Sequence, residues 1–246
     1  MHYFEILSTD VHEEPVFIEI FILCCLYICH DNYIIIVTNK NLCGGSMSTR
    51  IYDAIKNRIS SYDKGEVFFT SDFIDIASLP TIRKCLSRQT EEGNIRRIID
   101  GVYERPRYSK LLEAFLPTDP EKVAYALARK YHWTISPCGD VALNKLGLST
   151  QVPFVWSYVS DGPYREFSWD NITLSFKHKS NREISFLSNV SIIFIEAIKT
   201  LGKNNIDENV IAILKKRLNE NDKKLLLKEA VDSPSWIFDI VKKVCE

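Results

Sequence analysis

The sequence predicts an α+β fold. Apolar residues recur at helical spacing in residues 48–60 and 120–131. They alternate along residues 154–178, a stretch rich in aromatic and β-branched residues, which predicts a small antiparallel sheet. From residue 187 onward the helical spacing returns. The chain has 246 residues, of which 46% are hydrophobic, so it can fill one large or two small cores.

The charge is uneven along the chain. Residues 1–46 hold six acids and one base, a charge of −5, whereas the whole chain carries −1, so the other residues carry +4. Residues 47–110 hold twelve bases and nine acids, or +3. The balance excludes a histone-like basic protein, and the local excess concerns binding partners, not the fold.

The cysteines indicate a reducing compartment. There are seven, an odd number, with no CxxC pair. This is not a disulfide framework, so we expect a cytoplasmic protein.

Residues 1–46 are a separate problem. The apolar stretch Val16–Cys29 is 14 residues long and contains Glu19, which is short for a membrane span, and no base precedes it as in a signal peptide. It fits a buried helix or strand pair, or a membrane-associated hairpin. Alternatively, the codons of Gly44 and Gly45 belong to a ribosome-binding sequence before Met47. We hypothesise that Met47 is the start and that residues 1–46 are a non-native or poorly ordered extension, which the intact mass of natively expressed protein would test.

Residues 47–110 begin with three predicted helices and a short strand. Ser48 is the expected N-cap of the first helix, and a short strand follows at residues 67–69. The stretch "DFIDIAS" predicts a second helix, capped by Thr70 or Ser71. Ser78 is the expected cap of a third helix, which has Pro80 in its first turn and ends at Gly93. Its expected buried face consists of Ile82, Cys85, Leu86 and Gln89.

A β-hairpin follows the third helix. Two apolar runs, "NIRRII" and "GVYERP", meet at Asp100-Gly101, a strong hairpin signal. The order helix, strand, helix, helix, hairpin is that of a winged helix-turn-helix, in which the third helix enters the major groove of DNA and the hairpin follows the backbone. The candidates for base edges and groove phosphates are therefore Arg83, Lys84, Ser87 and Arg88, and the hairpin arginines would neutralise phosphates.

Two further interpretations remain open. Many winged helices only bind other proteins, so the basic residues also fit an acidic protein partner. A net charge of +3 is modest, so we expect useful DNA affinity only from a homodimer or a tandem array.

A second region, residues 111–202, is predicted to be an α+β domain, followed by C-terminal helices at 203–246. Pro117 and Pro120 mark the linker, and Asp119 is the expected cap of the next helix. A strand at "HWTISP", a helix that ends near Gly147 and three strands follow, with a turn at Asp170-Asn171 between the last two.

Several stretches together resemble a known family. They are "GEVFFTSDF", "LSRQTEEGNIRRIIDGVYERPRYS", "VAYALARKY", "ISPCGDVALNKLGLSTQVP", "SDGPYREF" and "ITLSFKHKS". They resemble the AbiEi-like antitoxins, transcriptional regulators of abortive-infection type IV toxin–antitoxin systems, in the branch with an N-terminal winged helix. The resemblance covers Met47 to about Gly202, and "LGLSTQVP" and "SDGPYR" are its most specific parts.

The resemblance implies an operator-binding autorepressor that also counters a nucleotidyltransferase toxin, without needing to bind that toxin directly. Carried over by position, the implied DNA-facing residues are Arg83, Lys84, Ser87, Arg88, Arg96, Arg97, Tyr103 and Arg105. The family commonly has leucine where this sequence has Gln89, which puts the packing of the third helix in question.

Four polar residues of the second region are candidates for partner binding: Ser149, Gln151, Asp161 and Arg165. Turn and loop-capping chemistry explains the same residues. No phosphate-binding loop, nucleophile elbow or zinc spacing occurs, and the five histidines are scattered. We therefore expect no catalytic residues, metal or cofactor. A nuclease that uses the predicted sheet of residues 111–202 remains a third option.

Overall fold

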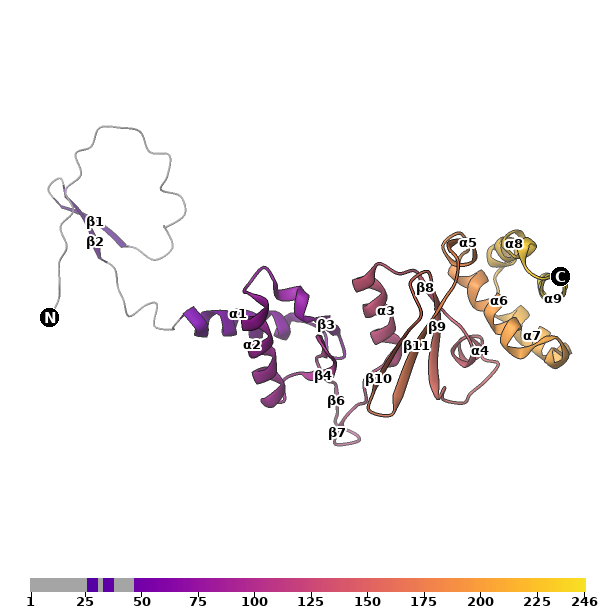
Figure 1. The fold of residues 1–246 in the computed structure, drawn as a ribbon, viewed down its shortest axis with the longest axis horizontal. Helices are drawn as coiled ribbons and strands as arrows, with labels where there is room; N and C mark the ends of the chain where they lie inside the picture. Colours follow the sequence, from indigo (N-terminus) through magenta and orange to yellow (C-terminus); the bar gives the residue numbers. More distant parts are fainter. Residues whose placement is uncertain (1–25, 31–32, 38–46) are drawn as a thin grey trace. The chain divides into compact units, whose positions relative to one another are not determined.

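The structure is a computed structural model that describes residues 26–30, 33–37 and 47–246 (Figure 1). The chain divides into two compact units, Met1–Ala54 and Ile55–Glu246. In the first unit, β1 (Leu26–His30) pairs antiparallel with β2 (Tyr33–Val37). The hypotheses about residues 1–25, 31–32 and 38–46 lie outside the described residues. Helix α1 (Met47–Ser61) spans the boundary between the units.

After the end of α1, the second unit continues with a small three-stranded sheet and one α-helix. The elements are β3 (Val67–Phe69), η1 (Thr70–Phe73), α2 (Leu79–Glu91), β4 (Arg96–Ile99) and β5 (Val102–Glu104). The strands form an antiparallel sheet in the order β3-β5-β4. The predicted hairpin turn is present, and Gly101 has the positive φ of +72° that such a turn favours in glycine.

The prediction of a second α-helix is wrong. The chain forms only the 3₁₀ helix η1, and its start is held by the side chain of Asp72, which accepts a hydrogen bond from the Phe69 backbone at 2.8 Å. Neither Thr70 nor Ser71 is the cap. Phe73 is fully buried at the end of this turn and packs edge-on against Tyr62 and Phe68, whose rings stack on each other. The contacts of Phe73 therefore bury this segment in the core without a second α-helix.

A second hairpin lies just before the predicted linker, in residues for which the sequence predicted no element. Strand β6 (Tyr108–Ser109) pairs with β7 (Ala114–Phe115), and the Leu116 N–H donates to the Arg107 carbonyl at 2.8 Å. The strands are too short for a periodic signal, which is why the sequence did not predict them.

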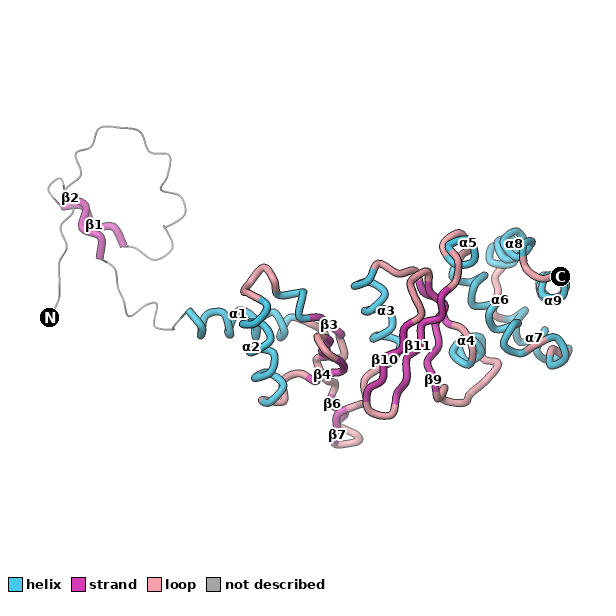
Figure 2. The backbone as a smooth tube through the Cα atoms, in the orientation of Figure 1, coloured by secondary structure: helices cyan, strands magenta, loops and turns pink. Residues whose placement is uncertain are grey.

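A mixed sheet forms the centre of the second unit. Its elements are α3 (Pro120–Tyr131), β8 (Ile135–Pro137), α4 (Asp140–Leu146), β9 (Val155–Ser160), β10 (Arg165–Trp169) and β11 (Ile172–His178). The strand order is β10-β11-β9-β8, and Figure 2 shows β10, β11 and β9 next to one another. Strand β11 runs parallel to β9. The prediction of a purely antiparallel sheet is therefore wrong, although the hairpin β10–β11 and its turn at Asp170 are confirmed.

Helices cover both faces of this sheet. Tyr158 faces the core that includes Val123 and Leu127 of α3, whereas the next residue, Val159, packs with Ile192 on the other face. Figure 1 shows α3 on one side of the sheet and α4 and α6 on the other. The alternation along β9 is the period of two that the sequence predicted.

The C-terminal helices share a core with the α+β region. They are α5 (Asn181–Ile184), α6 (Asn189–Leu201), η2 (Lys203–Asn205), α7 (Glu208–Lys216), α8 (Glu220–Glu229), η3 (Ala230–Asp232) and α9 (Ser235–Cys245). One apolar cluster joins Leu146 of α4, Ile198 of α6, Leu214 of α7, Leu226 of α8 and Val241 of α9. Residues 203–246 therefore complete this core.

A second apolar cluster crosses the predicted boundary near residue 110. Val67, Phe69 and Val102 of the small sheet belong to the same cluster as Leu127 and Phe176. The α+β class is confirmed. In the described part of the chain, we find no helix with both the length and the apolarity that a membrane crossing requires.

Candidate nucleic-acid interface

Helix α2 presents the predicted polar face to solvent. Ile82, Leu86 and Gln89 are at most 1% exposed, while the four candidates on the opposite face are exposed: Arg83, Lys84, Ser87 and Arg88. The buried side-chain amide of Gln89 has a hydrogen-bond partner, because its Oε1 accepts a hydrogen bond from Asn94 at 3.0 Å. The buried face of α2 therefore accommodates a glutamine at the position where the resembled family has leucine.

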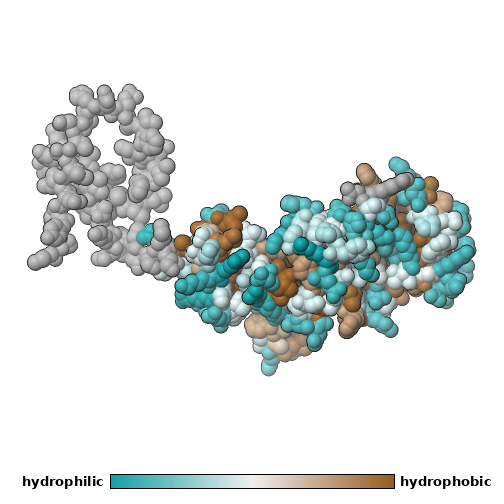
Figure 3. Space-filling model, in the orientation of Figure 1, coloured by the Kyte–Doolittle hydropathy of each residue, from teal (hydrophilic) through white to brown (hydrophobic). Residues whose placement is uncertain are grey.

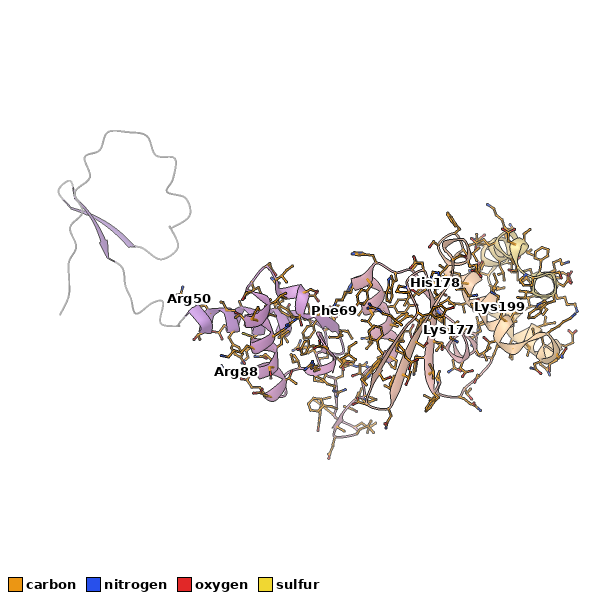
Figure 4. All side chains as sticks on the ribbon, in the orientation of Figure 1. Arg50, Phe69, Arg88, Lys177, His178 and Lys199 are labelled. Carbon is orange, nitrogen blue, oxygen red and sulfur yellow. The ribbon has the colours of Figure 1, made fainter. Side chains whose placement is uncertain are left out.

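Two of these candidates have acidic neighbours four residues further along the chain. The Ser87 hydroxyl donates to Glu91 at 3.1 Å, and Nε of Arg88 donates to Glu92 at 3.0 Å. The Arg88 side chain is 64% exposed, and Figure 4 shows it on the outer side of α2. Exposed i,i+4 pairs contribute about 0.3–0.5 kcal/mol, so a phosphate competes readily with such a carboxylate.

The two adjacent arginines of β4 point to different environments. Arg97 is exposed and pairs with Asp100, whose side chain is 97% exposed. Arg96 points inward: its Nη1 donates to the carbonyl of Leu116 at 3.1 Å and to the Thr118 hydroxyl at 3.2 Å. Successive side chains of a strand point to opposite faces, so this pair divides into one surface and one structural arginine.

The partner of Arg96 is a buried carboxylate that the sequence analysis missed. Glu104 is 1% exposed and lies 3.6 Å from Nη1 of Arg96, and it accepts a hydrogen bond from Thr118 at 2.6 Å. A buried carboxylate requires such compensation. The available signal was Glu104 itself, a charged residue inside an apolar strand.

Arg105 also serves the fold. Its Nη1 donates to the carbonyls of Ser60 and Tyr62, the first at 2.9 Å. These carbonyls lie at the C-terminal end of α1, where helix carbonyls lack intrahelical partners and a cation is favourable. Arg105 therefore holds α1 against the strand β5.

Tyr103 is in the core, not on the surface. It is 6% exposed, and its ring stacks on Phe68 with a centroid distance of 6.0 Å. Burial raises the pKa of its hydroxyl, while the positive charges of Arg97 and Arg83 act in the opposite direction. Arg97 lies opposite Tyr103 in the antiparallel β4–β5 pair, so these two side chains are on the same face of the small sheet, and Arg83 of α2 is near enough for its charge to act on the same hydroxyl.

Five of the eight predicted residues are solvent-exposed on α2 or β4, and we call this set the α2–β4 surface: Arg83, Lys84, Ser87, Arg88 and Arg97. The other three, Arg96, Tyr103 and Arg105, are anchored in the fold. Within the described part of the chain, Arg83 and Lys84 make no ion pair within 4.0 Å, so their charges face solvent.

The predicted partner-binding residues separate into two local structures. The Ser149 hydroxyl accepts from the backbone of Gln151 at 3.2 Å, and Asn144 donates to the Gln151 carbonyl at 2.7 Å. Asp161 accepts from the backbone of Thr134 at 2.9 Å. These contacts match the loop and turn interpretations.

Arg165 lies on an aromatic pair. Its guanidinium carbon is 5.0 Å from the ring centroid of Tyr131 and 5.9 Å from that of Trp133. The two rings stack on each other with centroids 4.8 Å apart. Arg165 and Asp161 therefore contact different groups and do not form one pocket. His178 of β11 contacts the turn between them, since its Nδ1 lies 2.8 Å from the carbonyl of Gly162 and its ring is 6.2 Å from that of Tyr164. Figure 4 labels Lys177 beside it.

Metal-binding side chains do not gather in the described residues, where no group of three or more His, Cys, Asp or Glu is placed to hold an ion. The fold and surface define an α+β protein that exposes basic side chains of a helix and an adjacent hairpin. The chain belongs to the family described as "Family of unknown function (DUF6088)", whose model matches residues 54–226, more than half of the sequence. A comparison with curated proteins gave no match.

Proposed function

We propose that the protein is a DNA-binding transcriptional regulator that represses its own operon, with residues 47–110 as a winged helix-turn-helix. In this proposal α2 is the recognition helix and the β4–β5 hairpin is the wing. The sequence of elements supports it, with η1 in the place of the second helix.

The observation that carries the proposal is the exposure of arginines on two successive elements, Arg83 on α2 and Arg97 on the β4–β5 hairpin. A recognition helix and a wing must present cations on one side to follow one duplex. Lys84 and Arg88 extend this surface along α2.

The roles divide by position. We assign Arg83, Ser87 and Arg88 to base edges and nearby phosphates, and Lys84 and Arg97 to the DNA backbone. Arg96, Tyr103 and Arg105 support the module from inside. The modest charge leads to weak binding by one copy.

We further propose an antitoxin role against a nucleotidyltransferase toxin. Its support is the resemblance of "LGLSTQVP" and "SDGPYR" to the AbiEi-like antitoxins. The proposed regulator acts in the cytoplasm, and the free thiols of Cys85, Cys138 and Cys245 fit a reducing compartment. No catalytic step belongs to this role.

A second candidate function is a protein-binding winged helix that does not touch DNA. The observation in its favour is the acidic neighbourhood of the surface arginines, since Glu92 and Asp100 pair with Arg88 and Arg97. Under this alternative, the same cations meet an acidic protein.

The test is binding of the full chain to the DNA upstream of its own gene, measured by fluorescence anisotropy with a shuffled duplex as control. We expect tighter binding to the upstream duplex, and loss of that binding in Arg83→Ala/Arg97→Ala. The matched control is Lys215→Ala/Lys216→Ala on α7, which removes two exposed cations elsewhere. No preference of the wild type for the upstream duplex would favour the protein-binding alternative, and equal preference in wild type and Arg83→Ala/Arg97→Ala would place the DNA contact outside the α2–β4 surface.

A further inference from the structure

The β6–β7 hairpin exposes an unusual amount of apolar surface. Leu111 is 93% exposed, Leu112 65%, Phe115 57% and Tyr108 49%. All four lie within eight residues. Brown and tan side chains gather at the lower edge of Figure 3, where Figure 1 places β6 and β7. A concentrated apolar patch of this kind marks an interaction site more often than single exposed residues do.

The hairpin is an ordered element. The rings of Tyr108 and Phe115 form a cross-strand pair, edge to face at 5.4 Å. In the tip, the Leu112 N–H donates to the hydroxyl of Ser109 at 3.3 Å, and Glu113 adopts a positive φ of 50°. Pairs of this type stabilise small hairpins. The exposed leucines are therefore presented by a defined turn.

The base of the hairpin is fixed to the β4–β5 hairpin. Arg96 of β4 donates to the carbonyl of Leu116, directly after β7, and Thr118 donates to Glu104 of β5. A partner bound at the tip would therefore have a fixed position relative to the α2–β4 surface.

The charges of the tip are self-complementary. Lys110 precedes the two leucines and Glu113 follows them, and both are exposed. When two such tips meet around a two-fold axis, with the leucines in contact, each Lys110 faces a Glu113. Two-fold contacts use the same patch on both copies, so a patch that carries both signs around an apolar centre suits a second copy.

We propose that the β6–β7 hairpin is a dimerisation arm that binds the same hairpin of a second copy of this chain. The leucines form the apolar centre, and Lys110 and Glu113 pair across the axis. The patch is small against the roughly 800 Å² per partner of a standard interface, so the dimer forms with a dissociation constant of roughly micromolar order. This association needs no DNA, so it is tested separately from the proposed function.

The first experiment measures the oligomeric state of the full chain by sedimentation equilibrium in the absence of DNA. Wild type is expected to dimerise, and Leu111→Ser/Leu112→Ser is expected to weaken dimerisation at least about 30-fold. The control, Val152→Ser/Phe154→Ser, removes two side chains that are 85% and 84% exposed on another loop, and it should dimerise like wild type. Circular dichroism and thermal unfolding of each variant establish that it is folded.

A charge-reversal experiment identifies the occupant. Lys110→Glu and Glu113→Lys should each fail to self-associate, because like charges then meet across the axis. An equimolar mixture of the two variants should dimerise, because one tip is wholly acidic and the other wholly basic. The mixture also distinguishes pairing between copies from an ion pair within one hairpin.

Three results would overturn the proposal. The first is a wild type that stays monomeric at about 100 µM, which is about 100 times the expected dissociation constant. The second is a leucine variant that dimerises like wild type, and the third is a mixture no more associated than its separate components. A monomeric wild type whose leucine variant loses DNA affinity would assign the arm to DNA instead.

Discussion

The guanidinium of Arg96 lies 3.6 Å from the carboxylate of Glu104, on the strand that pairs with its own. Arg97, the next residue, points to solvent instead. Two neighbouring arginines that look equivalent in the sequence therefore have different roles, and substitutions separate them.

Arg96→Ala is expected to lower the free energy of unfolding by roughly 1–3 kcal/mol, because it leaves Glu104 buried with less compensation. Arg97→Ala removes an exposed pair and should change this free energy by less than about 0.5 kcal/mol. Urea denaturation measures both values. Equal effects of the two substitutions would show that the inward contact of Arg96 does not matter for stability.

Gly162, in the stretch "SDGPYR", is expected to tolerate no side chain. A Cβ at this position would lie 2.3 Å from the indole of Trp133. Gly162→Ala should therefore cost roughly 1–3 kcal/mol, the usual range for overpacking. The measurement is the midpoint of thermal or urea unfolding.

A second substitution tests the cause of that cost. Trp133→Leu removes the ring that the new methyl group would meet, so Gly162→Ala should cost less in the Trp133→Leu background than in wild type. An unchanged cost in the double variant would place its origin in the backbone and not in the indole.

Cys138 makes the stability depend on pH in the alkaline range. Burial raises the pKa of its thiol to about 11, and the thiol is 2% exposed. The pKa of this thiol is higher in the folded than in the unfolded chain. Its stabilising contribution to folding is therefore complete below about pH 8.5 and is lost as the pH rises toward 11. The expected loss is of the order of 2–3 kcal/mol.

The control for this prediction is Cys138→Ala, which lacks the titrating group. Urea midpoints of both proteins, measured between pH 8 and pH 10.5, should fall more steeply for wild type. Parallel curves would mean that ionisation of this thiol is not coupled to folding.

Much of the fold was predictable because its signals are local. The Asp119 side chain caps α3 by accepting from the Glu121 backbone at 3.0 Å, and Gly147 ends α4 with a φ of +72°. Such caps depend on a few neighbouring residues. The confirmed turn at Asp100-Gly101 has the same origin.

The errors concern relations that no local pattern encodes. Alternation identified β9 and β11 as strands, but a period of two is the same in parallel and antiparallel pairs, so it gave no warning that Phe176 lies opposite Tyr158 in a parallel ladder. The same holds for the candidate interface. Nothing local distinguishes Arg105, bound to the end of α1, from Arg97.

The salt dependence of DNA binding tests the central claim most directly. The logarithm of the affinity for the upstream duplex, plotted against the logarithm of the salt concentration, should be linear for the full chain, with a slope of about −0.9 for each phosphate neutralised. Arg83→Gln/Arg97→Gln should make the slope shallower by up to about 2, and Lys215→Gln/Lys216→Gln should leave it unchanged. An unchanged slope in the first variant, or no binding by wild type, would contradict the assignment of the α2–β4 surface to DNA.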